Sequence, residues 1–261
     1  MAERPDERGA GPVRGQVRSL LVLAIAFAAS LLGSMSGGSA SALSIPAWLA
    51  MGFPLPTAIA TDKLSAAVWT LLGARNLLRQ REVDWLLLAG MGGVGLLGAW
   101  LGARATLTLD PEPLKRFAGG IILALVGVLL ARPRLGSAPA TPRLSRGLTG
   151  ACGLPLGFYE GMLGSGNSLV ASLLFSAGRG YDLIRALGHY YILAFAWCAL
   201  AAATYIGHGD YDLSLMLPAT LGSSAGGYLG SRIARARGTG FVRVLFAAAG
   251  IGLGLKLLLA R

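Results

Sequence analysis

The run WLLLAGMGGVGLLGAWLGA, residues 85–103, contains no charged side chain. A helix needs about 20 consecutive apolar residues to cross the hydrocarbon core of a bilayer, so this run is long enough for one crossing. Further uncharged, mostly apolar runs occupy residues 19–61, 117–131, 161–178, 190–207, 213–231 and 244–255. These runs fill most of the 261-residue chain. They predict an all-α, polytopic membrane protein with no separate soluble domain.

The composition supports a membrane protein and argues against a soluble domain, a nucleic-acid-binding protein and a metal site. Hydrophobic residues make up 54% of the chain and charged residues only 13%, whereas a soluble domain has about 25% charged residues. The net charge of +11 does not indicate nucleic-acid binding, because the arginines lie between apolar runs, as in cytoplasmic loops. Cys152 and Cys198 have apolar neighbours and no metal-ligand spacing, so we expect no metal and no cofactor. The polar residues 1–18 are predicted to be an N-terminal tail and not part of a cleaved signal peptide, since no cleavage site follows the next apolar stretch.

The sequence repeats itself. Moving it by 128 positions without gaps aligns residues that chance seldom pairs: Trp69 with Trp197, Asp84 with Asp212, and Arg104 with Arg232. Glycines align in the same register, including Gly33 with Gly161, Gly38 with Gly166, Gly98 with Gly226 and Gly102 with Gly230. The chain is therefore predicted to contain two copies of one unit.

The two units divide the chain into four parts. Residues 19–131 form the first membrane repeat and residues 147–261 the second, with a linker rich in Pro, Arg and Ser at residues 132–146. Each unit opens with an apolar stretch broken by small residues, at 33–41 and at 157–168. Three predicted spans follow in each unit, at 56–78, 85–107 and 113–130, then at 182–206, 211–234 and 240–259.

Loop charges predict that the units are inverted. The loop 75–84 carries Arg75, Arg79 and Arg81, while its counterpart 208–212 carries no lysine or arginine. Under the positive-inside rule these equivalent loops face opposite sides, and the arginine-rich linker is cytoplasmic. Each broken stretch must then be re-entrant, entering and leaving on one side. The tail would lie outside, unless the first broken stretch crosses fully.

The broken stretches are candidate anion sites. A break in a helix within the bilayer exposes N–H groups and the positive end of a half-helix dipole, which together favour an anion. The candidate ligands in the first break are Ser36, Gly37, Gly38, Ser39 and Ser41, and those in the second are Gly164, Ser165, Gly166, Asn167 and Ser168. The alternative is that these small residues only allow helices to pack closely.

Five other side chains are candidates. Thr61 and His189 are paired by the repeat and begin equivalent spans, so both could hydrogen-bond one anion, with His189 as a pH-sensitive contact. Lys63 could attract an anion or form a structural ion pair, for which Asp62 is the nearest carboxylate in sequence. Tyr190 offers a hydroxyl group or interface packing. Glu160 is the candidate for proton coupling, with a helix cap as its alternative.

The glycines at 157, 161, 164 and 166 resemble the repeated glycine signature of the sulfite exporter TauE/SafE family, also called the toluene-sulfonate uptake permease family. In the first unit Pro46, Gly52, Ala58, Ala60 and Thr61 resemble the proline, glycine and Ala-x-x-Thr pattern of the same family, and the resemblance covers nearly the whole chain. This sequence departs from the family pattern at four places. Ser39-Ala40-Ser41 and Gly166-Asn167-Ser168 stand where the family has triple glycines, Ser172 stands where it has a proline, and His189 stands where it has a threonine.

The resemblance implies a bacterial inner-membrane, multi-pass transporter of sulfite, sulfoacetate or another organosulfonate. We expect a secondary carrier that works by alternating access, with the anion between the two repeats. The alternatives are a passive anion channel and a carrier of a non-sulfur anion such as a carboxylate. An enzyme is not expected, because no nucleophile, metal or phosphate-binding motif is evident. Membrane lipids and the anion are the expected partners, and a homodimer stays an open alternative to a single copy.

Overall fold

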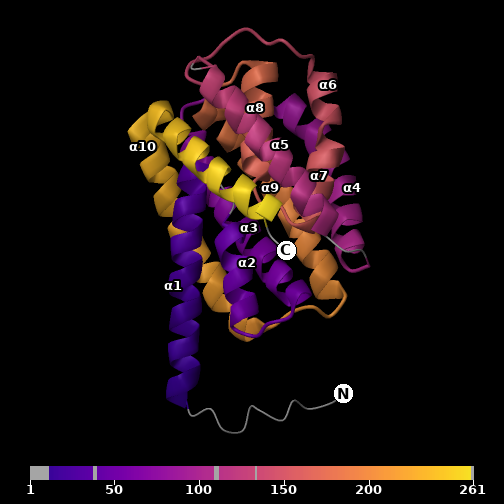
Figure 1. The fold of residues 1–261 in the computed structure, drawn as a ribbon, viewed down its shortest axis with the longest axis vertical. Helices are drawn as coiled ribbons and strands as arrows, with labels where there is room; N and C mark the ends of the chain where they lie inside the picture. Colours follow the sequence, from indigo (N-terminus) through magenta and orange to yellow (C-terminus); the bar gives the residue numbers. More distant parts are fainter. Residues whose placement is uncertain (1–11, 38–39, 109–111, 133, 260–261) are drawn as a thin grey trace.

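The computed structural model describes residues 12–37, 40–108, 112–132 and 134–259 (Figure 1). Ten helices and no strand occur within these ranges. The first unit contains α1 (Pro12–Ser36), α2 (Ser41–Ala50), α3 (Leu55–Leu77), α4 (Trp85–Thr106) and α5 (Glu112–Ala131). The second contains α6 (Arg146–Ala151), α7 (Gly153–Met162), α8 (Asn167–Arg179), α9 (Leu183–Gly207) and α10 (Leu213–Leu259).

The helices confirm the prediction of an all-α, polytopic membrane protein. Within the described ranges, four helical segments are long and apolar enough to cross a bilayer: Gly15–Ser36, Trp85–Thr106, Leu183–Gly207 and Leu213–Leu259. Large apolar side chains such as Leu86, Leu221 and Val244 are exposed on the outer surface. This outer surface suits lipid and would be costly in water.

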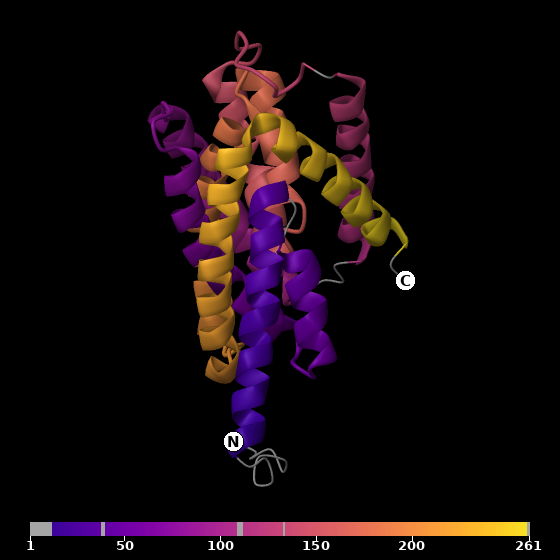
Figure 2. The same cartoon turned by 90° about the vertical axis from the view of Figure 1, so that its left-hand side faces the viewer.

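The helix boundaries follow the repeat found in the sequence. α3 and α9 begin 128 residues apart, as do α4 and α10. α10 is itself two helical arms, because Gly238 interrupts it with non-helical dihedral angles, φ 81° and ψ −179°. The chain turns there, and the second arm folds back beside the molecule as the counterpart of α5 (Figure 2).

Each broken stretch is a helical hairpin. The Arg18 guanidinium near the start of α1 donates to the Met51 carbonyl at the end of α2, 3.1 Å away. In the second unit the main-chain N–H groups of Arg143 and Leu144, just before α6, donate to the Gly178 carbonyl near the end of α8. The two arms of each hairpin thus begin and end close together, and their re-entrant placement in the bilayer stays a prediction.

The breaks are shorter than the sequence predicted. The first was expected at 33–41 and the second at 157–168, but helix continues to Ser36 and to Met162. A glycine inside a helix costs only about 1 kcal/mol, and close packing offsets this cost. A Cβ on Gly157 would lie 2.1 Å from the Gly95 carbonyl oxygen of α4, and one on Gly161 would lie 2.1 Å from that of Ala99. These two glycines are packing positions.

The two units exchange their hairpins. The arm α7 packs on α4 of the other unit, and α1 packs on α10, while α3 and α9 pack together at the centre. α1 rises from the lower end of Figure 1, whereas the chain descends from α6 into α7. These two segments run in opposite directions in this view, while the inverted relation of the two units stays a prediction. The membrane side on which each loop lies stays a prediction.

Candidate functional site

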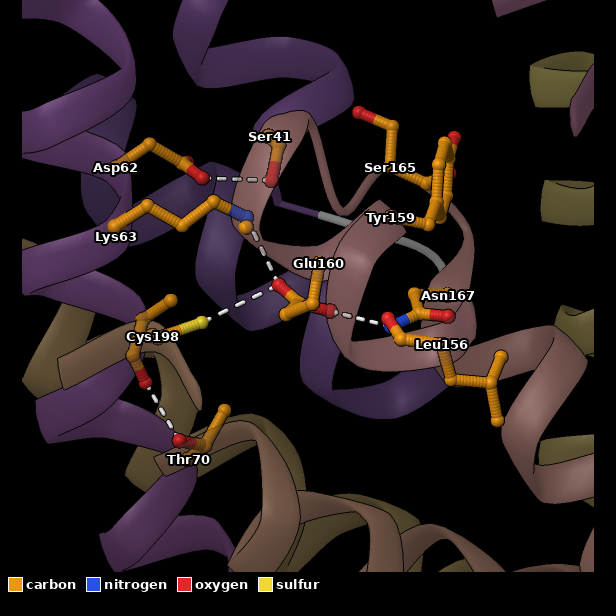
Figure 3. Close-up of polar contacts among 12 residues, drawn as sticks. Ser41, Asp62, Lys63, Thr70, Leu156, Tyr159, Glu160, Ser165, Asn167 and Cys198 are labelled. Carbon is orange, nitrogen blue, oxygen red and sulfur yellow. Dashed lines mark hydrogen bonds and ion pairs between the residues drawn. The ribbon is translucent and has the colours of Figure 1, made fainter. Parts of the chain in front are cut away.

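The two hairpin tips meet at the centre of the molecule. Gly37 in the first break and Gly164 and Gly166 in the second have positive φ, at 56°, 70° and 82°. The Ser168 hydroxyl at the start of α8 donates to the Gly37 carbonyl, so the two breaks are in direct contact. Polar side chains from α2, α3, α7, α8 and α9 converge here, and we call them the central cluster: Ser41, Ser44, Asp62, Lys63, Glu160, Asn167, Ser168, Tyr190 and Cys198. Figure 3 labels Ser41, Asp62, Lys63, Glu160, Asn167 and Cys198 of this cluster.

A buried ion pair joins the two units. The Lys63 ammonium on α3 lies 2.9 Å from a Glu160 carboxylate oxygen on α7. The Lys63 side chain is 0% exposed and that of Glu160 is 6% exposed. Gly164 lies against the pair, since a Cβ there would be 2.3 Å from Glu160 Oε1 and 2.4 Å from Lys63 Nζ. Of the two roles considered for Lys63, the structure contains the ion pair, but with Glu160 rather than Asp62.

Glu160 accepts hydrogen bonds from four directions. Besides Lys63, its donors are Asn167 Nδ2 at 2.8 Å, the Cys198 thiol at 3.2 Å and the Tyr190 hydroxyl. Such a set of donors stabilises the carboxylate form.

A second buried carboxylate, Asp62, faces the first hairpin. It accepts hydrogen bonds from Ser41 Oγ at 2.7 Å and from Ser44 Oγ at 2.6 Å, both on α2. Asp62 and Lys63 are adjacent on α3, and adjacent helical residues point in different directions. Asp62 therefore binds the first hairpin while Lys63 reaches the second.

The central cluster surrounds a small cavity. Its volume is about 20 Å³, which is room for about one water molecule. The lining includes both carboxylates, Asp62 and Glu160, together with Ser41, Ser168 and Tyr190. The site is thus closed in this conformation, and an anion of several heavy atoms needs a larger space.

Most of the predicted site residues lie in or beside the central cluster. Ser41, Lys63, Asn167, Ser168 and Tyr190 belong to it. Gly37, Gly164, Gly166 and Ser165 form the breaks beside it, and the Ser165 carbonyl accepts from Tyr159 at 2.6 Å. Ser36 donates to the Leu32 carbonyl in its own helix. Gly38 and Ser39 fall outside the described residues. The role of all these residues in anion binding stays a prediction.

Thr61 and His189 lie elsewhere. Thr61 Oγ1 donates to the Thr57 carbonyl of its own helix at 2.8 Å. His189 Nδ1 lies 2.8 Å from the Arg185 carbonyl, and its Nε2 accepts the Asp84 main-chain N–H at 3.1 Å. Both ring nitrogens are thus used by the backbone. Within the part of the chain that the structure describes, neither side chain hydrogen-bonds to the central cluster, so a joint anion contact stays a prediction without geometric support.

Sequence reasoning missed three members of the cluster. Asp62 was considered only as a partner for Lys63, and Ser44 and Cys198 were not considered as polar ligands. The available signal for Asp62 was a carboxylate in an otherwise apolar span, which is costly unless it is functional or paired. Ser44 and Cys198 carry no comparable signal, because both residue types are common in apolar helices.

A separate polar cluster lies at the end of the molecule that carries the linker. Asp84 caps α4 and pairs with Arg146 at 3.0 Å and with Arg179 at 3.6 Å. Burial opposes ionisation of Asp84, but the hydrogen bonds from Arg146 and from the Leu87 N–H outweigh it, so the pKa of Asp84 is lowered. The linker is thereby held against α4 and α8 rather than left free.

Comparison with known proteins agrees with this architecture. The family model described as Sulfite exporter TauE/SafE matches residues 22–257. A probable membrane transporter protein of Haemophilus influenzae is 28% identical, over 85% of this chain and 88% of its own length. The probable membrane transporter protein ORF9 of a Sinorhizobium species is 26% identical, over 89% of this chain and 89% of its own length. The probable membrane transporter protein YfcA of Escherichia coli is also 26% identical, over 90% of this chain and 87% of its own length. No solved structure matches. The chain therefore belongs to the TauE/SafE family of sulfite exporters and is a membrane transporter.

Proposed function

We propose that this protein is a secondary transporter of small sulfur-containing anions, such as sulfite, sulfoacetate or another organosulfonate, and that it works by alternating access in the bacterial inner membrane. The anion would bind at the central cluster, between the two repeats. The observation that carries the proposal is Lys63, a fully buried cation placed where the two broken hairpins of opposite units meet.

The surroundings of Lys63 suit an anion. Among the residues whose side chains the structure describes, Lys63 is the one buried lysine or arginine. The hydroxyl groups of Ser41 and Ser168 and the amide of Asn167 lie around it, and α8 begins at Asn167, so the positive end of its dipole faces the site. In a region of low dielectric constant, one cation with several fixed donors binds an anion strongly.

The Lys63–Glu160 pair also offers a means of coupling binding to movement. It joins α3 of the first unit to α7 of the second. An anion that takes the place of Glu160 beside Lys63 weakens this link between the units. The cavity of about 20 Å³ can then enlarge and open to one side. Binding and opening are in this way parts of one equilibrium.

The substrate class rests on the family, whose printed description is of sulfite exporters. The central cluster itself supports a small anion without distinguishing a sulfonate from a carboxylate. A passive channel is the second candidate, and it would need a continuous pore where the structure has a closed site.

Counterflow in proteoliposomes tests the proposal. Purified protein is reconstituted and preloaded with sulfite, sulfoacetate, methanesulfonate, sulfate or acetate, and uptake of the labelled anion is followed. We expect saturable counterflow for at least one sulfur-containing anion. Non-saturable flux without counterflow would indicate a channel, and counterflow of acetate alone would reject the sulfur substrate.

Lys63 is tested with charge-balanced variants. Lys63→Met alone leaves Glu160 as an unpaired buried charge, so Lys63→Met with Glu160→Gln is the main variant, because it removes both charges and preserves volume. We expect this variant to elute as a folded protein and to lose counterflow. Lys256→Met is the control, since Lys256 donates to the Ala42 carbonyl outside the central cluster. Full counterflow in the double variant would remove Lys63 from the site.

A further inference from the structure

We infer that Asp62 is the proton-binding group of the transport site, and that the anion crosses the membrane together with a proton held on this carboxylate. The inference rests on the proposed function and adds the identity of the coupled ion. It starts from the charge balance of the central cluster.

The buried charges do not balance. Asp62 and Glu160 are two carboxylates, and Lys63 is the one ammonium beside them, so ionisation of all three leaves one negative charge. This net charge lies on the wall of the same cavity of about 20 Å³ that the anion would enter. Anion binding is repelled in that state and favoured when one carboxylate is neutral. When one carboxylate binds a proton for each anion that enters, the net negative charge and its repulsion of the anion are removed.

The contacts favour Asp62 over Glu160 as the proton acceptor. Glu160 has four donors among the described residues, one of which is the Lys63 ammonium, and its protonation before the anion binds would leave that ammonium without its counter-charge. Among the described residues, the donors to Asp62 are the hydroxyl groups of Ser41 and Ser44. Hydroxyl groups can donate to a carboxylate or accept from a carboxylic acid, so they tolerate both forms.

Ser44 provides the switch between these forms. Its oxygen lies 2.6 Å from Asp62 Oδ1 and 3.1 Å from the Ala40 carbonyl oxygen. A hydroxyl group has one proton to donate, so Ser44 donates to Asp62 when the carboxylate is ionised. When Asp62 is protonated, its O–H donates to Ser44 Oγ, and Ser44 donates to Ala40 instead. Neither state leaves a buried polar group without a partner, which keeps both states accessible.

Among the described residues, the ionisable neighbours of Asp62 are few. On α3 the charged neighbour is Lys63, and the second hairpin contributes Glu160. α9 contributes the Cys198 thiol, which also lines the cavity. On α10, the Lys256 ammonium donates to the Ala42 carbonyl of α2, 2.6 Å away. Asp62 is 5% exposed and lines the same cavity, so a proton bound there lies beside the anion.

Infrared spectroscopy tests proton binding without any substrate. A protonated carboxylic acid has a carbonyl band that an ionised carboxylate lacks. We expect purified wild-type protein to show this band at acidic pH and to lose it as the pH is raised. Asp62→Asn should lack this titrating band, and Glu160→Gln should keep it. A band that is absent from the wild type, that does not titrate, or that persists unchanged in Asp62→Asn overturns the assignment.

Transport tests the coupling. Methanesulfonate is the probe, because it stays ionised across this pH range and its own charge does not change. In proteoliposomes that are acidic outside, we expect the wild type to accumulate it and Asp62→Asn to lose at least about 10-fold of this accumulation. Exchange of labelled for unlabelled anion needs no net proton movement, so we expect Asp62→Asn to lose a much larger fraction of its gradient-driven accumulation than of its exchange.

The two proposals fail in different ways. If the wild type transports no anion of the panel, the proposed function is wrong, while the infrared result still decides whether Asp62 binds a proton. If Asp62→Asn accumulates the anion as the wild type does, or if only a sodium gradient drives accumulation in the wild type, the proton-coupling inference is wrong and the transport function stands. Equal fractional losses of exchange and of accumulation in Asp62→Asn also overturn it, because Asp62 is then needed for more than the proton.

Discussion

At the scale of single residues, Gly164 controls the geometry of the buried ion pair. Its φ is 70°, and a Cβ there would lie 2.3 Å from Glu160 and 2.4 Å from Lys63. We expect Gly164→Ala to displace the pair and to lower counterflow at least about 10-fold, with a backbone strain of about 1–2 kcal/mol. Gly93→Ala is the matched control, because a Cβ at Gly93 meets nothing within 4 Å. Normal transport by Gly164→Ala would show that the pair tolerates displacement.

His189 is a second residue whose role can be decided by one change. Its ring nitrogens contact the Arg185 carbonyl and the Asp84 N–H, so we expect His189→Thr to lower the melting temperature in detergent by a few degrees. The pH dependence of anion affinity should be unchanged, since Asp62 and not His189 faces the cavity. A flatter pH dependence in this variant would support the sensor role predicted from the sequence.

At the scale of helices, glycines set how closely the exchanged hairpins pack. A Cβ on Gly102 would lie 2.0 Å from the Phe158 carbonyl oxygen, and one on Gly226 would lie 2.2 Å from that of Phe27. Both clashes involve main-chain atoms, so they are relieved only by moving a whole helix. We expect Gly102→Val and Gly226→Val each to destabilise the protein by about 2 kcal/mol or more, measured as a lower melting temperature. Gly90→Val, at a position with nothing within 4 Å, should leave it unchanged.

Asp84 connects several elements and adds a pH-dependent stability. Its pKa is lowered in the folded protein, so its stabilising effect is present above the unfolded value of about 3.9 and is lost as the pH falls through the folded value. We expect Asp84→Asn to lower the melting temperature at neutral pH, because Arg146 and Arg179 lose a counter-charge. The difference from the wild type should close below about pH 4. A difference that is the same at all pH values would show that the charge of Asp84 contributes nothing.

At the scale of the whole molecule, the arrangement predicts an inverted topology. Gln80 and His208 are exposed and are related by the repeat, so inversion places them on opposite sides of the membrane. His208 is preferred to Gly209, whose φ of 97° would strain a new cysteine. We expect Gln80→Cys and His208→Cys, each combined with Cys152→Ala, to be labelled by an impermeant thiol reagent from opposite sides. Labelling of both from one side would show parallel repeats.

The sequence by itself determined the class of protein, the helices and their repetition. The bilayer demands about 20 apolar residues per crossing, so residues such as those at 85–103 can hardly form anything else. The 128-residue offset was visible because Trp69, Asp84 and Arg104 recur at equal spacing, and the helices α3 and α9 begin with that offset. The predicted breaks were too long, because glycines that allow close packing look the same in sequence as glycines that end a helix.

Only the tertiary structure decided which side chains meet. Lys63 and Glu160 are separated by 97 residues and pair because the second hairpin packs across onto the first unit. Asp62 is adjacent to Lys63 in sequence but turns to Ser41 and Ser44 on another helix. Neighbouring residues on a helix point about 100° apart, so their partners depend on which helices surround them. The sequence therefore supplied the charged groups, and helix packing determined that one carboxylate pairs with Lys63 while the other accepts from the hydroxyl groups of α2.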